Sequence, residues 1–203
     1  MGVYSQILIC ASLLIATAQD IRARSVLDLV WIPAAVGVAY SLVVSYPSVE
    51  LIVIKVAFVG GVALAFTYFG AIGQADAIAL VFVAADANPA SPIFPLLGTA
   101  VVALGHISYE YATGNARGPK TIPLQKFLDE QRWIPKAVIS DGVRSEVSSD
   151  VNSAREEVSA KSNAGSLVEV TYGVPTVAYL GIGYLAYVLY LILFSTGTFL
   201  ALP

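Results

Sequence analysis

Long apolar stretches dominate this sequence and restrict it to folds that a lipid bilayer can hold. Six runs are candidate membrane-spanning helices, at residues 3–18, 29–46, 51–69, 75–87, 93–108 and 174–200. A helix needs roughly 20 apolar residues to cross the hydrocarbon core. Only 12% of the 203 residues are charged, against roughly 25% in soluble domains. We therefore expect an all-α polytopic membrane protein with about six transmembrane helices.

The fourth run is the weakest of the six. The segment Asp86-Ala-Asn-Pro-Ala-Ser-Pro92 interrupts it soon after it begins. So short a span requires local thinning of the bilayer or support from neighbouring helices. The topology therefore depends on whether this run is a membrane helix.

A polar insert separates the fifth run from the sixth. Its segment 145–166 is rich in Ser, Asn and Ala, which predicts a mobile portion, and residues 133–139 and 167–172 are predicted to be short strands. The expected organisation is three parts: helices 1–5 with both candidate aspartates, the soluble insert, and helix 6. These parts cover residues 1–108, 109–172 and 173–203.

The positions of the basic residues orient this arrangement. Arg22 and Arg24 follow the first run, and Lys55 lies in the third. The remaining basic residues all lie in the insert: Arg117, Lys120, Lys126, Arg132, Lys136, Arg144, Arg155 and Lys161. With six spans and an external N-terminus, the first connection, the third connection and the insert share one face, which the positive-inside rule makes cytoplasmic. Asp20 and Asp76 fall on that face.

Asp20 and Asp76 are the strongest candidates for chemistry, because an ionisable group beside hydrocarbon is costly and is a functional hypothesis by default. Two neighbouring carboxyl groups cannot both ionise cheaply, so they share a proton and act as an acid and a base. Such a pair can activate a water and protonate a scissile carbonyl oxygen. With one cysteine, Cys10, and one histidine, His106, we expect no metal and no cofactor.

Other interpretations of these residues remain open. Asp76 lies in Gly70-Ala-Ile-Gly-Gln-Ala-Asp76, whose glycines at 70 and 73 permit either a tight turn near a substrate or close helix packing. Asp20 could instead be a solvated loop carboxylate paired with Arg22 or Arg24.

Three further acids compete with this pair or lie across from it. Asp28 opens the second run and is a rival member of the pair, although we favour a role as an N-cap. Asp86 and Glu50 fall on the opposite face in this topology, where we expect solvated helix ends.

These segments together resemble a known family. Asp20-Ile-Arg-Ala-Arg-Ser-Val-Leu-Asp28, Gly73-Gln-Ala-Asp76 and Val170-Thr-Tyr-Gly-Val-Pro175 are similar to the archaeal preflagellin and prepilin peptidases, within the type IV prepilin peptidase group of Gly-x-Gly-Asp (GxGD) aspartic membrane proteases. The resemblance implies that Asp20 and Asp76 are catalytic. It also implies partners, namely archaellin and pilin precursors whose short basic leader is cut at the cytoplasmic face.

The sequence departs from the family pattern at two positions and lacks one segment. Ala75 replaces the second glycine of Gly-x-Gly-Asp, which archaeal members commonly tolerate, and Ile78 replaces a frequent lysine. Bacterial relatives often add a four-cysteine zinc segment and an amine methyltransferase activity. The zinc segment is absent here, so we expect cleavage of the precursor without methylation.

Two other classes of function compete with a protease. A small cation- or proton-coupled transporter could use Asp20 and Asp76, although no internal repeat is visible and the acids lie at span ends. A non-catalytic component of a surface filament would leave the placement of the glycines and aspartates unexplained. Membrane lipid is an expected partner, and nucleic acid is not.

Overall fold

The computed structural model describes residues 4–44, 49–69, 72–148, 151–163 and 165–195. The chain divides into two compact units. The helical unit comprises Met1–Asp20, Val26–Leu104 and Pro175–Pro203, and the sheet unit comprises Ile21–Ser25 and Gly105–Val174.

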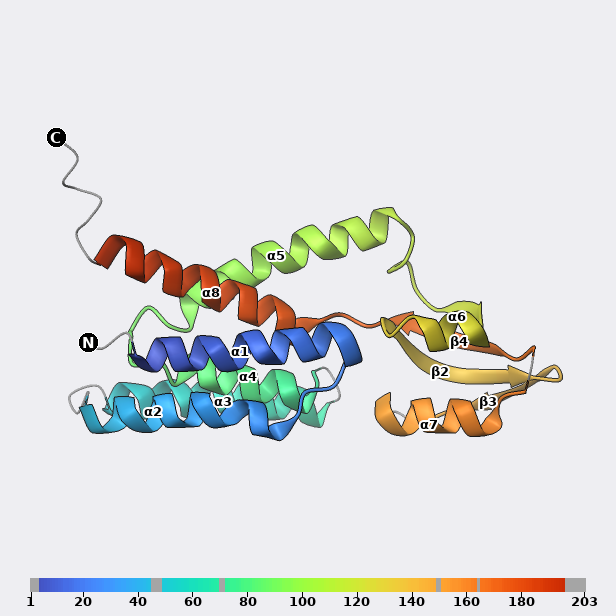
Figure 1. The fold of residues 1–203 in the computed structure, drawn as a ribbon, viewed down its shortest axis with the longest axis horizontal. Coiled ribbons are helices and arrows are strands. Elements are labelled where there is room, and N and C mark those ends of the chain that lie inside the picture. The colour runs from blue at the N-terminus through green and yellow to red at the C-terminus, as the bar shows by residue number, and fades with distance from the viewer. Residues whose placement is uncertain (1–3, 45–48, 70–71, 149–150, 164, 196–203) are drawn as a thin grey trace. The chain divides into compact units, whose positions relative to one another are not determined.

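Each of the six predicted runs overlaps a helix, and their residues 3, 45–46 and 196–200 lie outside the described residues (Figure 1). The helices are α1 (Tyr4–Ala23), α2 (Ile32–Val44) after the 3-10 turn η1 (Asp28–Trp31), α3 (Val49–Tyr68), α4 (Gln74–Ala84), α5 (Ile93–Ala112) and α8 (Thr176–Ser195). Within the described residues, α1, α3, α5 and α8 are long and apolar enough to cross a membrane. The helix of the fourth run, α4, has 11 residues and is among the shorter ones.

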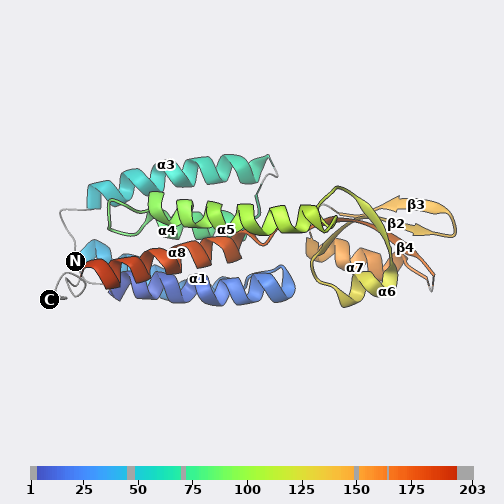
Figure 2. The ribbon, with the colours of Figure 1, turned by 90° about the horizontal axis from the view of Figure 1, so that it is seen from above.

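Helix α8 supplies much of the core of the helical unit. Its inward face packs with apolar side chains of α1 and α4, and Figures 1 and 2 both place its N-terminal half beside α1. The fully buried members of this core, each at most 1% exposed, are Ile9, Leu13, Ala16, Ala34, Ala79, Val83, Leu180 and Tyr184. Two helices that are distant in sequence, α1 and α4, are thereby held against the same partner.

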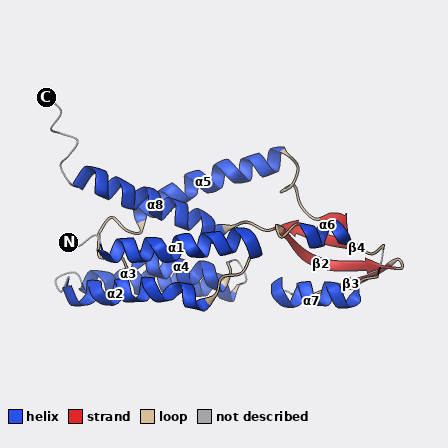
Figure 3. Ribbon diagram, viewed as in Figure 1, coloured by secondary structure: helices blue, strands red, loops and turns tan. Residues whose placement is uncertain are grey.

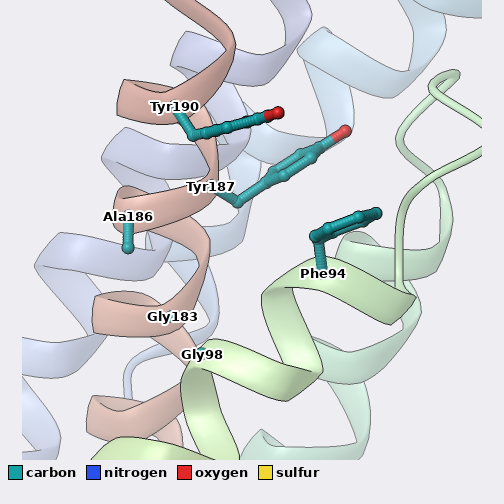
Figure 4. Close-up of a pocket in the computed structure, with 6 residues that line it drawn as sticks. All are labelled: Phe94, Gly98, Gly183, Ala186, Tyr187 and Tyr190. Atoms are coloured by element: carbon teal, nitrogen blue, oxygen red, sulfur yellow. The ribbon is translucent and has the colours of Figure 1, made fainter.

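Helix α8 meets α5 at a contact between glycines (Figure 4). A Cβ atom at Gly183 would lie 2.5 Å from both Pro95 O and Thr99 N, and one at Gly98 would lie 3.2 Å from Gly183 Cα. Glycine permits this approach because membrane helices pack closely where side chains are small. A cavity of about 180 Å³ lies at the crossing, lined by Phe94, Gly98, Gly183, Ala186, Tyr187 and Tyr190.

The sheet unit contains a four-stranded antiparallel sheet, so the expectation of an all-α chain with short strands understated its β content (Figure 3). The strands are β1 (Lys120–Pro123), β2 (Trp133–Ser140), β3 (Val143–Glu146) and β4 (Leu167–Tyr172), in the order β1-β4-β2-β3. The two predicted strands are confirmed as β2 and β4, which pair from Trp133↔Tyr172 to Ile139↔Leu167. Their register shifts between Pro135 and Ala137, as expected where proline has no N–H to donate.

Two helices cover one side of this sheet, α6 (Leu124–Asp129) and α7 (Val151–Lys161) (Figure 2). The predicted mobile stretch 145–166 therefore contains a helix, which corrects that expectation. Ala154 and Val158 are buried at 1% and 0% exposure, four residues apart on one face of α7. Val158 joins Phe127 of α6 in the core against the strands. That apolar contact orders a segment whose other residues are mostly polar.

We predict that Gly183→Ala destabilises the helical unit. The added methyl group has no room against the backbone of α5, and overpacking of this kind costs roughly 1 to 3 kcal/mol. Gly61→Ala in α3 is the matched control, since nothing lies within 4 Å of its Cβ position and alanine favours a helix. Thermal unfolding of the purified protein in detergent measures both variants. Equal stability of the two would contradict the glycine contact.

Candidate active site

Asp20 lies within α1, beyond the end expected for the first helix, because α1 continues to Ala23. The side chain is buried, with 9% exposure, so the interpretation as a solvated loop carboxylate is wrong. Its Oδ2 accepts a hydrogen bond of 3.3 Å from the backbone N–H of Ala178, in the first turn of α8. Thr17, one turn earlier, donates to the carbonyl of Val177 at 3.5 Å. The end of α1 is thus bonded to the start of α8.

Asp76 lies at the start of α4, as its third residue. Its Oδ2 accepts a hydrogen bond of 3.0 Å from the backbone N–H of Gly73, the N-cap residue. A Cβ atom at position 73 would lie 3.3 Å from that same oxygen, so glycine gives the carboxylate room to approach. The φ of Gly73 is −76°, which any residue adopts, so the turn itself does not require glycine. Ala75 packs against the core, and Gly70 lies outside the described residues.

The fold places these two carboxyl groups within range of each other's charge. Asp20 is close enough for its charge to act on the carboxyl group of Asp76. Each group accepts a backbone N–H at the N-terminus of a helix, where the helix dipole favours negative charge. Where two acids act on each other in this way, ionisation of one disfavours ionisation of the other.

Asp28 is placed differently. It is exposed and is the first residue of η1, whose N-cap is Leu27 and has no side-chain capping bond. The prediction that Asp28 caps the second helix is therefore wrong. Asp20, and not Asp28, is the acid whose charge acts on Asp76.

Asp86 departs most from its expected role as a solvated helix end, because it is fully buried at 0% exposure. Its carboxylate accepts hydrogen bonds from Gln6 Nε2 at 3.3 Å, Tyr184 Oη at 3.1 Å and the backbone N–H of Asn88 at 3.0 Å. Buried polar groups are tolerated when they are paired in this way. Glu50, by contrast, is exposed.

Lys55 completes a polar cluster around the loop that follows α4. Its Nζ donates to the carbonyl oxygens of Asp86, Asn88 and Ser91, the last two at 2.9 and 3.0 Å. Ser91 in turn donates to the carbonyl of Val83 at 2.6 Å. Sequence reasoning did not identify this cluster, although Lys55 is the one charge inside the third apolar run.

The described residues contain no group of three or more His, Cys, Asp or Glu side chains that could hold a metal ion.

Comparison with protein-family models, with curated proteins and with solved structures finds no match to this chain.

We predict that Lys55→Met unfolds the protein at a markedly lower temperature. Methionine keeps the length and apolar stem but leaves three carbonyl groups without their donor and the Asp86 carboxylate without a nearby cation. Breaking one side of a buried charged cluster costs roughly 3 to 5 kcal/mol, or about 6 to 20 °C for a chain of this size. Thermal unfolding in detergent measures the shift.

Glu50→Gln is the matched control, because it removes one charge from the same helix at an exposed position. Its effect is expected to stay below about 1 kcal/mol. If the two variants unfold at the same temperature, Lys55 does not support the loop.

Proposed function

We propose that this chain is a membrane aspartic endopeptidase that removes the short basic leader peptide from archaellin or type IV pilin-like precursors. The observation that carries the proposal is that the charge of Asp20, bonded to the start of α8, acts on Asp76 at the start of α4. The segments around these two residues also resemble those of the Gly-x-Gly-Asp membrane proteases, which supports Asp20 and Asp76 as the catalytic residues.

The reaction follows from the chemistry of two carboxyl groups that share a proton. The ionised member removes a proton from a water molecule, which attacks the scissile carbonyl carbon. The protonated member donates to the carbonyl oxygen, and proton transfer to the amide nitrogen then releases the leader. No nucleophilic side chain is consumed, because water is the nucleophile.

The backbone hydrogen bonds to Asp20 and Asp76 hold the two carboxyl groups in position. A carboxyl group that accepts a backbone N–H is held in orientation by a rigid helix end, and catalytic groups act best when they are oriented before the substrate arrives. The first turns of α8 and α4 supply those donors.

The side of the membrane and the substrate rest on charge and resemblance. Arg22, Arg24 and the eight basic residues of the insert favour a cytoplasmic location for the connections next to both acids. A precursor with a basic leader before a hydrophobic helix would present its cleavage site at the cytoplasmic surface of the membrane, with its own helix in the bilayer.

The competing structural interpretation is that both aspartates only cap helices. Asparagine separates the two roles, because its side-chain oxygen accepts the same backbone N–H but cannot act as an acid or a base at neutral pH. A cap survives the substitution, and the chemistry does not.

We therefore predict that Asp20→Asn and Asp76→Asn each reduce cleavage of a synthetic precursor by at least about 100-fold, the usual scale of acid–base catalysis. The assay uses purified protein in liposomes and a precursor with a basic leader and a hydrophobic segment. Each variant is expected to unfold within a few degrees of the wild type.

Asp28→Asn is the control and is expected to retain most of the activity. Full turnover in Asp20→Asn or Asp76→Asn would reject the pair. Loss of activity in Asp28→Asn with retention in Asp20→Asn would move the first catalytic role to Asp28, and failure of the wild type to cut would reject the proposed substrate.

A further inference from the structure

Two arginines of the sheet unit have buried guanidinium nitrogens without a hydrogen-bond partner among the described residues. These atoms are Nε and Nη1 of Arg24 and Nε of Arg155. Buried polar atoms in proteins are nearly always paired, and an unpaired charged donor is among the costliest exceptions. Donors left in this state call for an acceptor that the described residues do not supply.

The two arginines lie near each other. Arg24 belongs to the segment Ile21–Ser25, which is part of the sheet unit, and Arg155 projects from α7 of the same unit. Burial, and then the positive charge of Arg24, lower the pKa of Arg155 from its usual range. Two like charges held together in partial burial repel, so an anion between or beside them would relieve the repulsion.

Arg155 is rigidly placed. Its Nη2 donates to the carbonyl oxygens of Gln131 at 2.8 Å and Trp133 at 2.9 Å, and its guanidinium lies 5.0 Å from the centre of the Phe127 ring. These contacts use Nη2 of the guanidinium group and leave Nε without a partner among the described residues. A guanidinium fixed in this way is already oriented for a second ligand.

Two acids close to this region have other partners. Glu130 accepts from Arg132 and from the indole N–H of Trp133, at 2.8 and 2.7 Å. Glu110 accepts from Asn115 at 2.7 Å and lies 3.5 Å from His106. Each carboxylate is therefore engaged with a donor other than Arg24 or Arg155.

Arg24 also has an unusual backbone conformation. Its φ is 53°, in the left-handed region that side chains other than Gly and Asn seldom adopt. Such conformations cost free energy and gather at ligand sites and switches. Arg24 immediately follows α1, a helix long and apolar enough to span the bilayer, so a bilayer that α1 crosses would have its phosphate head groups near Arg24.

We propose that Arg24 and Arg155 form a binding site for the phosphate of an anionic phospholipid head group. Phosphate oxygens accept several N–H bonds at once and match the arginine fork, so one phosphate can satisfy the unpaired donors of both residues. Arg24 as a whole is only partly buried, although its Nε and Nη1 atoms are themselves buried. The site is independent of the proposed protease chemistry.

The test titrates the purified full-length protein in neutral detergent with phosphatidylglycerol, phosphatidylcholine or inorganic phosphate at constant ionic strength. Thermal unfolding reports binding, because a ligand that binds the folded state raises the midpoint. We expect phosphatidylglycerol to raise it in a saturable way. Phosphatidylcholine and inorganic phosphate at the same concentration are expected to raise it far less.

The variants locate the site. Arg24→Gln should weaken the apparent affinity for phosphatidylglycerol at least tenfold. Arg22→Gln is the matched control, since it removes the same charge two residues away at an exposed position and should change the affinity less than twofold. Arg155→Lys, which keeps the charge but removes Nε, should also weaken binding about tenfold.

Three results would overturn the proposal. No saturable effect of phosphatidylglycerol would show that the lipid does not bind. An equal loss in Arg22→Gln and Arg24→Gln would show general attraction to a charged surface. Equal stabilisation by inorganic phosphate, with no further gain from the lipid, would make free phosphate the ligand.

Discussion

The helical unit depends on how Lys55 holds the loop that follows α4. An α-helix of 11 residues is about 16 Å long, roughly half the thickness of the hydrocarbon core. Irregular backbone at membrane depth survives only where protein groups satisfy its N–H and C=O groups. Lys55 donates to three carbonyls of that loop, and Asp86 is held by residues from α1 and α8. This cluster satisfies the backbone of the loop at the end of the short helix α4.

The same anchorage bears on the candidate active site at the other end of α4. Asp76 is the third residue of a short, straight helix, so fixing the C-terminal end of α4 also fixes the height of Asp76. Asp20 is fixed through α8. A Cβ atom at Gly181 would lie 3.0 Å from the carbonyl oxygen of Leu13, so the contact between α1 and α8 is set by backbone atoms. Two tight attachments therefore determine the spacing of the two acids.

The sequence was sufficient to predict the positions of the helices and of two strands, because apolar runs and β-branched segments are local signals. The end of α1 was missed, since the apolar run stops at residue 18 while the helix continues through polar residues to Ala23. Helix α7 was missed because only Ala154 and Val158 anchor it in the core among mostly polar residues.

The candidate site was partly predictable for a different reason. Asp20 and Asp76 could be chosen as acids beside apolar runs, and charge placement put them on one face. The burial of Asp86 could not be foreseen, because its partners Gln6 and Tyr184 are 80 and 98 residues away in sequence. Whether a polar group is solvated or buried is decided by such distant donors, which no local pattern reports.

The central claim is that folding in the membrane brings the side chains at positions 20 and 76 together. Cross-linking with the shortest bifunctional methanethiosulfonate reagent tests this most directly, in a chain with Cys10→Ala, Asp20→Cys and Asp76→Cys reconstituted in liposomes. The account predicts efficient cross-linking of this pair and little for the matched pair Asp28→Cys and Asp76→Cys. Preferential linkage between positions 28 and 76, or none between 20 and 76 while both thiols react singly, would contradict it.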